Sequence, residues 1–143
     1  MGDDGERLAE RCAAAMWAED VASAGLGMVI EDVGPGQATL SMLVDAHMLN
    51  GHGLCHGGFI FALADSAFAF ACNSRNLRSV AQHCSITYLR PAQGGERLVA
   101  TARELALAGR SGLYDVQVTS EAGVVAEFRG QSRQVGGALV EGS

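Results

Sequence analysis

The chain has 143 residues, a formal net charge of −6 and an apolar fraction of 48%. This length and composition are typical of one packed domain, residues 1–143, and exclude a largely disordered chain. The negative charge argues against nucleic acid or an anionic membrane as the main partner, which leaves small molecules and self-association. The acidic start, MGDDGER, lacks a secretory signal, and four cysteines without paired spacing indicate free thiols, so we expect a cytoplasmic protein.

Two helices and a hairpin are predicted for the first half of the chain. In order, the elements are a helix over 6–20, strands over 26–33 and 37–44, a loop over 45–58 and an apolar helix from 59 to about 73. The turn signal Gly34-Pro35-Gly36 joins the two strands as a hairpin. The loop is glycine-rich and contains three of the four histidines.

The second half of the chain is predicted to form strands throughout. Alternating apolar residues predict strands over 82–89, 97–107, 113–120 and 124–134, and the tail after Gly136 is expected to fray. A sheet of this size needs an apolar helix to cover one face, and the 59–73 helix is the only candidate. We therefore predict an α+β domain in which a five- to six-stranded antiparallel sheet wraps a long central helix, with its core over about residues 26–137.

Asp65 is the only charged residue in the apolar stretch from Phe59 to Cys72, FIFALADSAFAFAC. Burying an unpaired carboxylate is costly, or it raises the pKa until the group is neutral. The alternative is an aspartate on the solvated side of an amphipathic helix. The residues one turn away are all apolar, namely Phe61, Ala62, Phe68 and Ala69. The position of Asp65 therefore indicates a functional carboxylate.

Several collinear motifs resemble one protein family. The pattern N-x5-HGG-x6-AD, formed by Asn50, His56, Gly57, Gly58, Ala64 and Asp65, resembles the signature of hotdog-fold acyl-CoA thioesterases. The longer string MLNGHGLCHGGFIFALADSAFAFACNS is similar to the phenylacetate-degradation (PaaI-type) branch, as are ITYLRPA, GLYDVQV and EFRGQSRQVGG. The resemblance covers roughly residues 26–137.

This resemblance implies a fold, an assembly and a reaction. It implies a long helix wrapped by an antiparallel sheet, dimers whose sheets join side by side and that pair into tetramers, and an active site at each dimer interface. The substrate would be an aryl-acetyl-CoA thioester of the phenylacetyl- or hydroxyphenylacetyl-CoA type, hydrolysed without a cofactor. Asp65 would be the catalytic carboxylate, the Gly57 N–H would polarise the thioester carbonyl, and Asn50 and His56 would position substrate or water.

The chemistry of thioester hydrolysis fits these residues. The reaction needs a base or nucleophile and hydrogen-bond donors for the oxyanion. Gly57 and Gly58 open the helix, where backbone N–H groups lack intrahelical partners and no Cβ blocks a substrate. Asp65 lies eight residues further on, about 12 Å along the helix axis. One helix cannot bring both groups to one carbonyl, so we predict a site shared between two copies of the chain.

Several residue roles stay open at this stage. Asp65 could attack the carbonyl or deprotonate a water, with Ser66 or Asn50 as donors that stabilise its charge. His56 either caps the helix or orients a reactant, and Asn50 is either a turn residue or a substrate contact. Candidate residues for the acyl pocket and the CoA phosphates are Leu54, Gly58, Phe59, Phe68, Arg90, Arg110, Arg129 and Arg133. Several relatives carry a serine or threonine helper on the strand after the helix; here either Gln82 or Ser85 replaces it, or the helper is absent.

Other functions fit the sequence less well. The histidines and Cys55 match no metal-ligand spacing, so we expect no metal, and Cys55 beside His56 favours a structural thiol over a nucleophile. A hotdog hydratase or dehydratase would pair a catalytic histidine with the acid, an arrangement that we do not find. A non-catalytic acyl-CoA-binding or sensing module would not need both Asp65 and the glycine pair.

Overall fold

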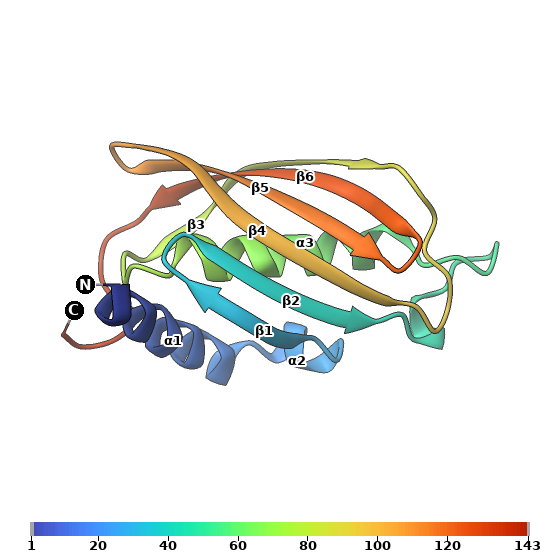
Figure 1. Ribbon diagram of the computed structural model, residues 1–143, viewed down its shortest axis with the longest axis horizontal. Helices are drawn as coiled ribbons and strands as arrows, with labels where there is room; N and C mark the ends of the chain where they lie inside the picture. The colour runs from blue at the N-terminus through green and yellow to red at the C-terminus, as the bar shows by residue number, and fades with distance from the viewer. Residues whose placement is uncertain (1, 143) are drawn as a thin grey trace.

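The computed structural model describes residues 2–142 (Figure 1). Its helices are α1 (Gly2–Glu19), α2 (Val21–Gly25), the short 3₁₀ helix η1 (Ala46–Met48) and α3 (Gly57–Cys72). Its strands are β1 (Val29–Gly34), β2 (Gln37–Leu43), β3 (Ser79–Tyr88), β4 (Arg97–Ala108), β5 (Ser111–Ser120) and β6 (Gly123–Gln134). None of the helices within 2–142 combines the length and apolarity needed to cross a membrane.

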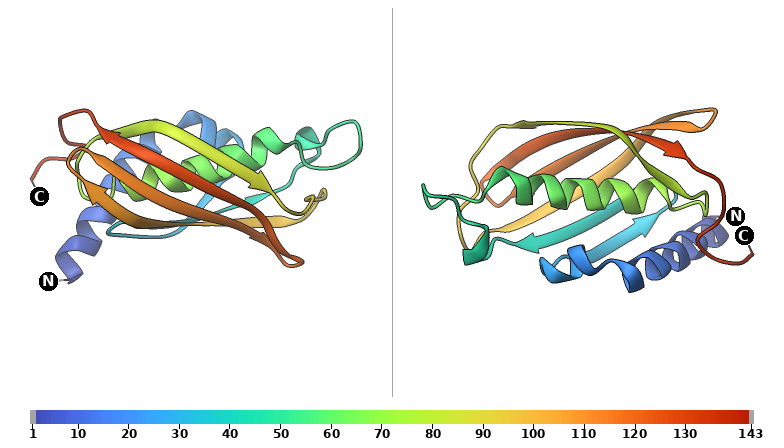
Figure 2. Two further views of the ribbon diagram at one scale, coloured as in Figure 1. Left: turned by 90° about the horizontal axis from the view of Figure 1, so that it is seen from above. Right: turned by 180° about the vertical axis from the view of Figure 1, so that it is seen from behind.

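One antiparallel sheet contains all six strands, in the order β1-β2-β4-β5-β6-β3. The sheet curves around α3, which runs across its inner face, while α1 lies beside β1 (Figures 1 and 2). The strand β3 therefore forms the edge of the sheet opposite β1. This arrangement confirms the predicted α+β architecture, a long central helix wrapped by an antiparallel sheet.

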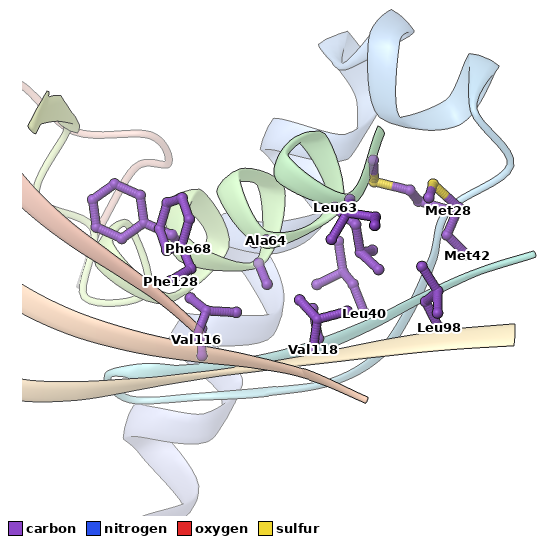
Figure 3. Packing of buried hydrophobic residues seen from close by; sticks show 14 of the residues in the cluster. Met28, Leu40, Met42, Leu63, Ala64, Phe68, Leu98, Val116, Val118 and Phe128 are labelled. Atoms are coloured by element: carbon purple, nitrogen blue, oxygen red, sulfur yellow. The ribbon is translucent and has the colours of Figure 1, made fainter. Parts of the chain in front are cut away.

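The core lies between α3 and the inner face of the sheet (Figure 3). Alternate residues of the strands supply it, as their apolar pattern predicts, and the helix contributes an almost fully buried face. Phe68 packs between the rings of Tyr114 and Phe128, with centroid distances of 5.5 and 5.9 Å. It is only 1% exposed, so this predicted acyl-pocket residue belongs to the core.

Polar side chains explain three differences from the prediction, namely the starts of α3 and β3 and one additional short helix. The helix α3 begins at Gly57 because the His56 side chain caps it and accepts a hydrogen bond from the Gly58 N–H. The unpredicted helix α2 forms because Asp20 accepts from the Ser23 N–H in the same way. The strand β3 begins at Ser79, since the Asn73 side chain accepts from its N–H and extends the ordered chain beyond α3.

The C-terminal tail does not fray, so that expectation was wrong. The side-chain oxygen Oδ1 of Asn76 accepts hydrogen bonds from the Leu139 and Val140 N–H groups at 2.7 and 2.9 Å. Its amide nitrogen donates to the carbonyls of Val140 and Gly142. Arg11 of α1 adds a 2.6 Å bond to the Glu141 carbonyl. These bonds hold the tail against the turn that follows α3.

Candidate active site

The first turn of α3 presents one free backbone donor. The Gly58 N–H donates to His56 Nδ1 at 2.9 Å, and the Phe59 N–H donates to the His56 carbonyl at 3.0 Å. The Gly57 N–H, by contrast, has no hydrogen-bond partner among residues 2–142. His56 thus has the capping role that the sequence left open, and the donor available to a substrate oxygen is the Gly57 N–H.

A pocket of about 400 Å³ lies at this end of α3. Its walls come from the loop before α3, the first turns of the helix and the end of β3. The lining residues are Asn50, Leu54, Cys55, Gly57, Ile60, Tyr88, Leu89, Arg90 and Pro91. The structure therefore brings together four predicted site residues, namely Asn50, Leu54, Gly57 and Arg90, and Arg90 adds a cation to the pocket lining.

Asn50 shapes the loop that leads into the pocket. Its side-chain oxygen accepts hydrogen bonds from the His52 and Leu54 N–H groups at 2.9 and 3.2 Å. Its backbone N–H donates to the Leu54 carbonyl at 2.7 Å. Asn50 is therefore a turn residue, and because it also lines the pocket, its side-chain N–H₂ group is placed to contact a ligand.

Asp65 lies two turns further along α3 and does not line this pocket. Its side chain is half-buried, and the only hydrogen bond to it within residues 2–142 comes from the Cys84 thiol, 4.0 Å from Oδ1. Burial raises the pKa of the Asp65 carboxyl above its ordinary value. Within one chain, the Asp65 carboxylate is thus distant from the Gly57 donor, and the carboxylate is poorly solvated.

The register of strand β3 determines which of its side chains face Asp65. Cys84 pairs with Gly130 on the inner side of the sheet, since a Cβ on Gly130 would meet the Phe68 ring at 2.8 Å. Ser85 therefore points to the outer side, away from Asp65. Gln82 is the extra residue of a β-bulge between Ala81 and His83. Within one chain, Ser85 therefore cannot assist Asp65. Gln82 remains a candidate helper, at the bulge in the edge strand β3.

Ser66 does not donate to Asp65. Its hydroxyl lies 2.9 Å from the Ser23 hydroxyl, which donates to Asp20 Oδ2 at 2.7 Å. This chain of hydrogen bonds ties α2 to α3 on the side of the helix away from β3. The charge of Asp65 therefore has no serine donor in its own helix.

Three further predicted residues, Phe59, Arg110 and Arg129, do not line this pocket. Arg110 is in the β4–β5 turn, beside Cys72 and Arg75 at the opposite end of α3, so it does not reach the pocket of its own chain. Arg129 pairs with Asp115 at 2.7 Å on the outer side of the sheet. Phe59 packs edge-on against the His56 ring, at a centroid distance of 6.2 Å.

A cysteine nucleophile finds little support in this geometry. Cys55 is buried, and burial raises the pKa of its thiol, which disfavours the thiolate form that a nucleophile needs. Within residues 2–142, no three His, Cys, Asp or Glu side chains are grouped so that they could hold a metal ion.

Sequence reasoning missed Tyr88 as a site residue. Its hydroxyl donates to the Gly57 carbonyl at 2.9 Å, and its ring lines the pocket. The signal was present in the ITYLRPA motif, which carried the family resemblance without a role for its tyrosine.

A sheet-wrapped helix that opens on a free glycine N–H and carries a half-buried carboxylate defines a hotdog thioesterase. A sequence model described as the thioesterase superfamily matches residues 52–127. The chain belongs to this superfamily and to its PaaI-type branch, and it is a thioester hydrolase.

Particular relatives are similar over most of the chain. The acyl-coenzyme A thioesterase PaaI of Escherichia coli is 44% identical over 126 residues, which are 87% of this chain and 90% of that protein. The structure of E. coli PaaI, from the phenylacetic acid degradation operon, matches with a TM-score of 0.91 over 93% of this chain and 97% of the other. A variant of PaaI from Thermus thermophilus is 42% identical, with a TM-score of 0.77 over 79% of this chain and 97% of the other. A Streptococcus mutans protein bound to acetyl-CoA is 25% identical, with a TM-score of 0.74 over 78% and 90%.

Proposed function

We propose that this protein hydrolyses aryl-acetyl-CoA thioesters, of the phenylacetyl- or hydroxyphenylacetyl-CoA type, to the free acid and CoA in phenylacetate catabolism. The free Gly57 N–H at the wall of the 400 Å³ pocket carries the proposal, since it is a ready donor for a thioester oxyanion. The similarity to E. coli PaaI, from the phenylacetic acid degradation operon, supports an aryl-acetyl group as the acyl part of the substrate. The apolar side chains of Leu54, Ile60 and Tyr88 suit an aromatic ring.

The reaction divides between a donor and a carboxylate. The Gly57 N–H stabilises the negative charge that develops on the thioester oxygen, and Asp65 acts on the carbonyl carbon. Asp65 either attacks the carbon, forming a mixed anhydride that water then hydrolyses, or removes a proton from the attacking water. In both routes water supplies the acid's new oxygen, and CoA leaves as its thiol. No cofactor is needed, and Arg90 at the pocket wall is the candidate contact for a CoA phosphate.

Each site forms between two copies of the chain. Gly57 and Asp65 are about 12 Å apart along one helix, too far to act on one carbonyl. Among the described strands, the edge strand β3 pairs only with β6. Asp65 lies beside this edge, where its carboxylate accepts from the Cys84 thiol of β3. Pairing of two β3 edges would join the sheets and set the Asp65 of one copy against the α3 N-terminus of the other. Such dimers pair into tetramers, and the protein acts in the cytoplasm.

Thiol release from phenylacetyl-CoA tests this function. Purified protein is mixed with the thioester and a thiol-reactive dye, with a substrate-free blank to subtract the four cysteines of the chain. We expect steady turnover by the wild type and a loss of more than about a hundredfold in Asp65→Ala. Acetyl-CoA and a long-chain acyl-CoA are assayed beside it, and an equal or higher kcat/KM for either would contradict the aryl-acetyl preference. Tight binding without thiol release would identify a sensing module instead.

A further inference from the structure

Two side chains hold one peptide group at the start of α3. The peptide between Gly57 and Gly58 consists of the Gly57 carbonyl and the Gly58 N–H. The N–H donates to His56 Nδ1 at 2.9 Å, and the carbonyl accepts from the Tyr88 hydroxyl, also at 2.9 Å. His56 is the neighbouring residue, whereas Tyr88 reaches across from the end of β3. The orientation of this peptide is thus fixed from both sides.

The ring of Tyr88 also explains why residue 57 is a glycine. Gly57 does not have the positive φ that would demand a glycine. A Cβ at this position would lie 3.0 Å from Tyr88 Cζ and 3.1 Å from the hydroxyl oxygen, closer than side chains normally approach. The close packing of the Tyr88 ring, and not the backbone conformation, therefore disfavours a side chain at residue 57, which would push the ring away by a few tenths of an ångström.

Tyr88 is placed to act on the site although it is not a core residue. It is 48% exposed, and it lines the pocket together with Gly57. Burial of its hydroxyl end raises the pKa of the phenol, so the group keeps the proton that it donates to the Gly57 carbonyl. Tyr88 is therefore a fixed wall of the pocket that bonds directly to the turn carrying the oxyanion donor.

A turn of two glycines needs such support. Glycine is a weak helix former and leaves the backbone many conformations, so an unsupported Gly57–Gly58 turn would be poorly ordered. Oxyanion donors contribute to catalysis only when they are oriented before the reaction begins. We propose that Tyr88 is a positioning residue that fixes the Gly57–Gly58 peptide and, through it, aims the Gly57 N–H at the thioester oxygen. This inference rests on the proposed thioesterase function.

Tyr88→Phe is the direct test, because it removes the hydroxyl and keeps the ring. We expect kcat for phenylacetyl-CoA to fall about five- to tenfold, with KM changed less than about twofold, since the oriented donor matters most in the transition state. Tyr114→Phe is the matched control. It removes an equal 2.9 Å hydrogen bond, from Tyr114 to Glu104 in the core, and kcat should stay at the wild-type value.

Amide hydrogen exchange measures the positioning independently of activity. In Tyr88→Phe the Gly58 and Phe59 amides, which both donate to His56, should exchange faster than in the wild type, while amides in the middle of α3 keep their protection. An active wild type with unchanged kcat in Tyr88→Phe, a change in KM alone, or unchanged exchange at Gly58 and Phe59 would each overturn this inference only. A wild type that hydrolyses no thioester would overturn the proposed function and this inference with it.

Discussion

At the scale of single residues, Gly57 and Gly58 have different roles although they are chemically identical neighbours. The Gly58 N–H is taken up by the His56 cap, and the Gly57 N–H stays free at the pocket wall. The sequence predicts that these glycines open the helix and that His56 either caps it or orients a reactant. The sequence cannot decide between these two roles of His56, because the decision depends on the side-chain rotamer of His56 and on Tyr88 from a distant strand.

Asp65 gives a prediction for the pH dependence of the reaction. Burial raises the pKa of its carboxyl above the ordinary value of 3.8, and the protonated acid can neither attack a carbonyl nor accept a proton from water. The kcat/KM should therefore fall as the pH drops through this raised pKa, so that the acid limb lies above pH 3.8. A pH–rate profile with phenylacetyl-CoA measures it. An acid limb at or below the ordinary aspartate value would show that donors from the partner more than offset the burial.

At the scale of elements, the packing of α3 against β6 depends on Gly130. A Cβ there would lie 2.8 Å from the Phe68 ring, so Gly130→Ala should destabilise the protein by about 1–3 kcal/mol through overpacking. Gly25→Ala is the matched control, because nothing lies within 4 Å of its Cβ position and it ends the helix α2 without a positive φ. Denaturant unfolding of both variants measures the difference. Equal stability of the two would contradict the close contact with Phe68.

The link between α2 and α3 makes a second prediction at this scale. The buried Ser23 hydroxyl bonds to both Asp20 and Ser66, so Ser23→Ala should lower the unfolding free energy by about 1 kcal/mol. Because the Ser66 hydroxyl bonds to Ser23 and not to Asp65, kcat should remain close to the wild-type value. Thermal unfolding and the thiol-release assay check both parts. Full stability in this variant would mean that the serine chain does not help to hold α2 on α3.

The sequence predicts the elements better than their ends. Alternation in β2, β5 and β6 identifies the strands, and the apolar run identifies α3, because burial imposes these periods directly. The short helix α2 and the tail after Gly136 were missed because single polar groups, Asp20 and Asn76, order them. Phe68 was assigned to the acyl pocket because an apolar helix residue near the carboxylate could face either the core or a ligand. Its burial between the rings of Tyr114 and Phe128 shows that it faces the core.

At the scale of the whole molecule, the two edges of the sheet differ. The edge strand β1 has α1 beside it, whereas β3 is a ten-residue strand with an exposed Val80 and Tyr88. Long exposed edges favour pairing with another strand. The proposed dimer joins two such edges, and it also accounts for the position of Asp65, which is half-buried beside β3 and far from the donor of its own chain.

The central claim, a site shared between two chains, is tested most directly by purified heterodimers of two inactive variants. Chains carrying Gly57→Ala and Asp65→Ala are co-expressed with different tags, and assemblies holding both tags are isolated. A shared site leaves one intact Gly57–Asp65 pair per heterodimer, so about half of the wild-type kcat for phenylacetyl-CoA should return. If each site lies within one chain, both sites stay defective, and activity no higher than that of the parent variants would contradict the account.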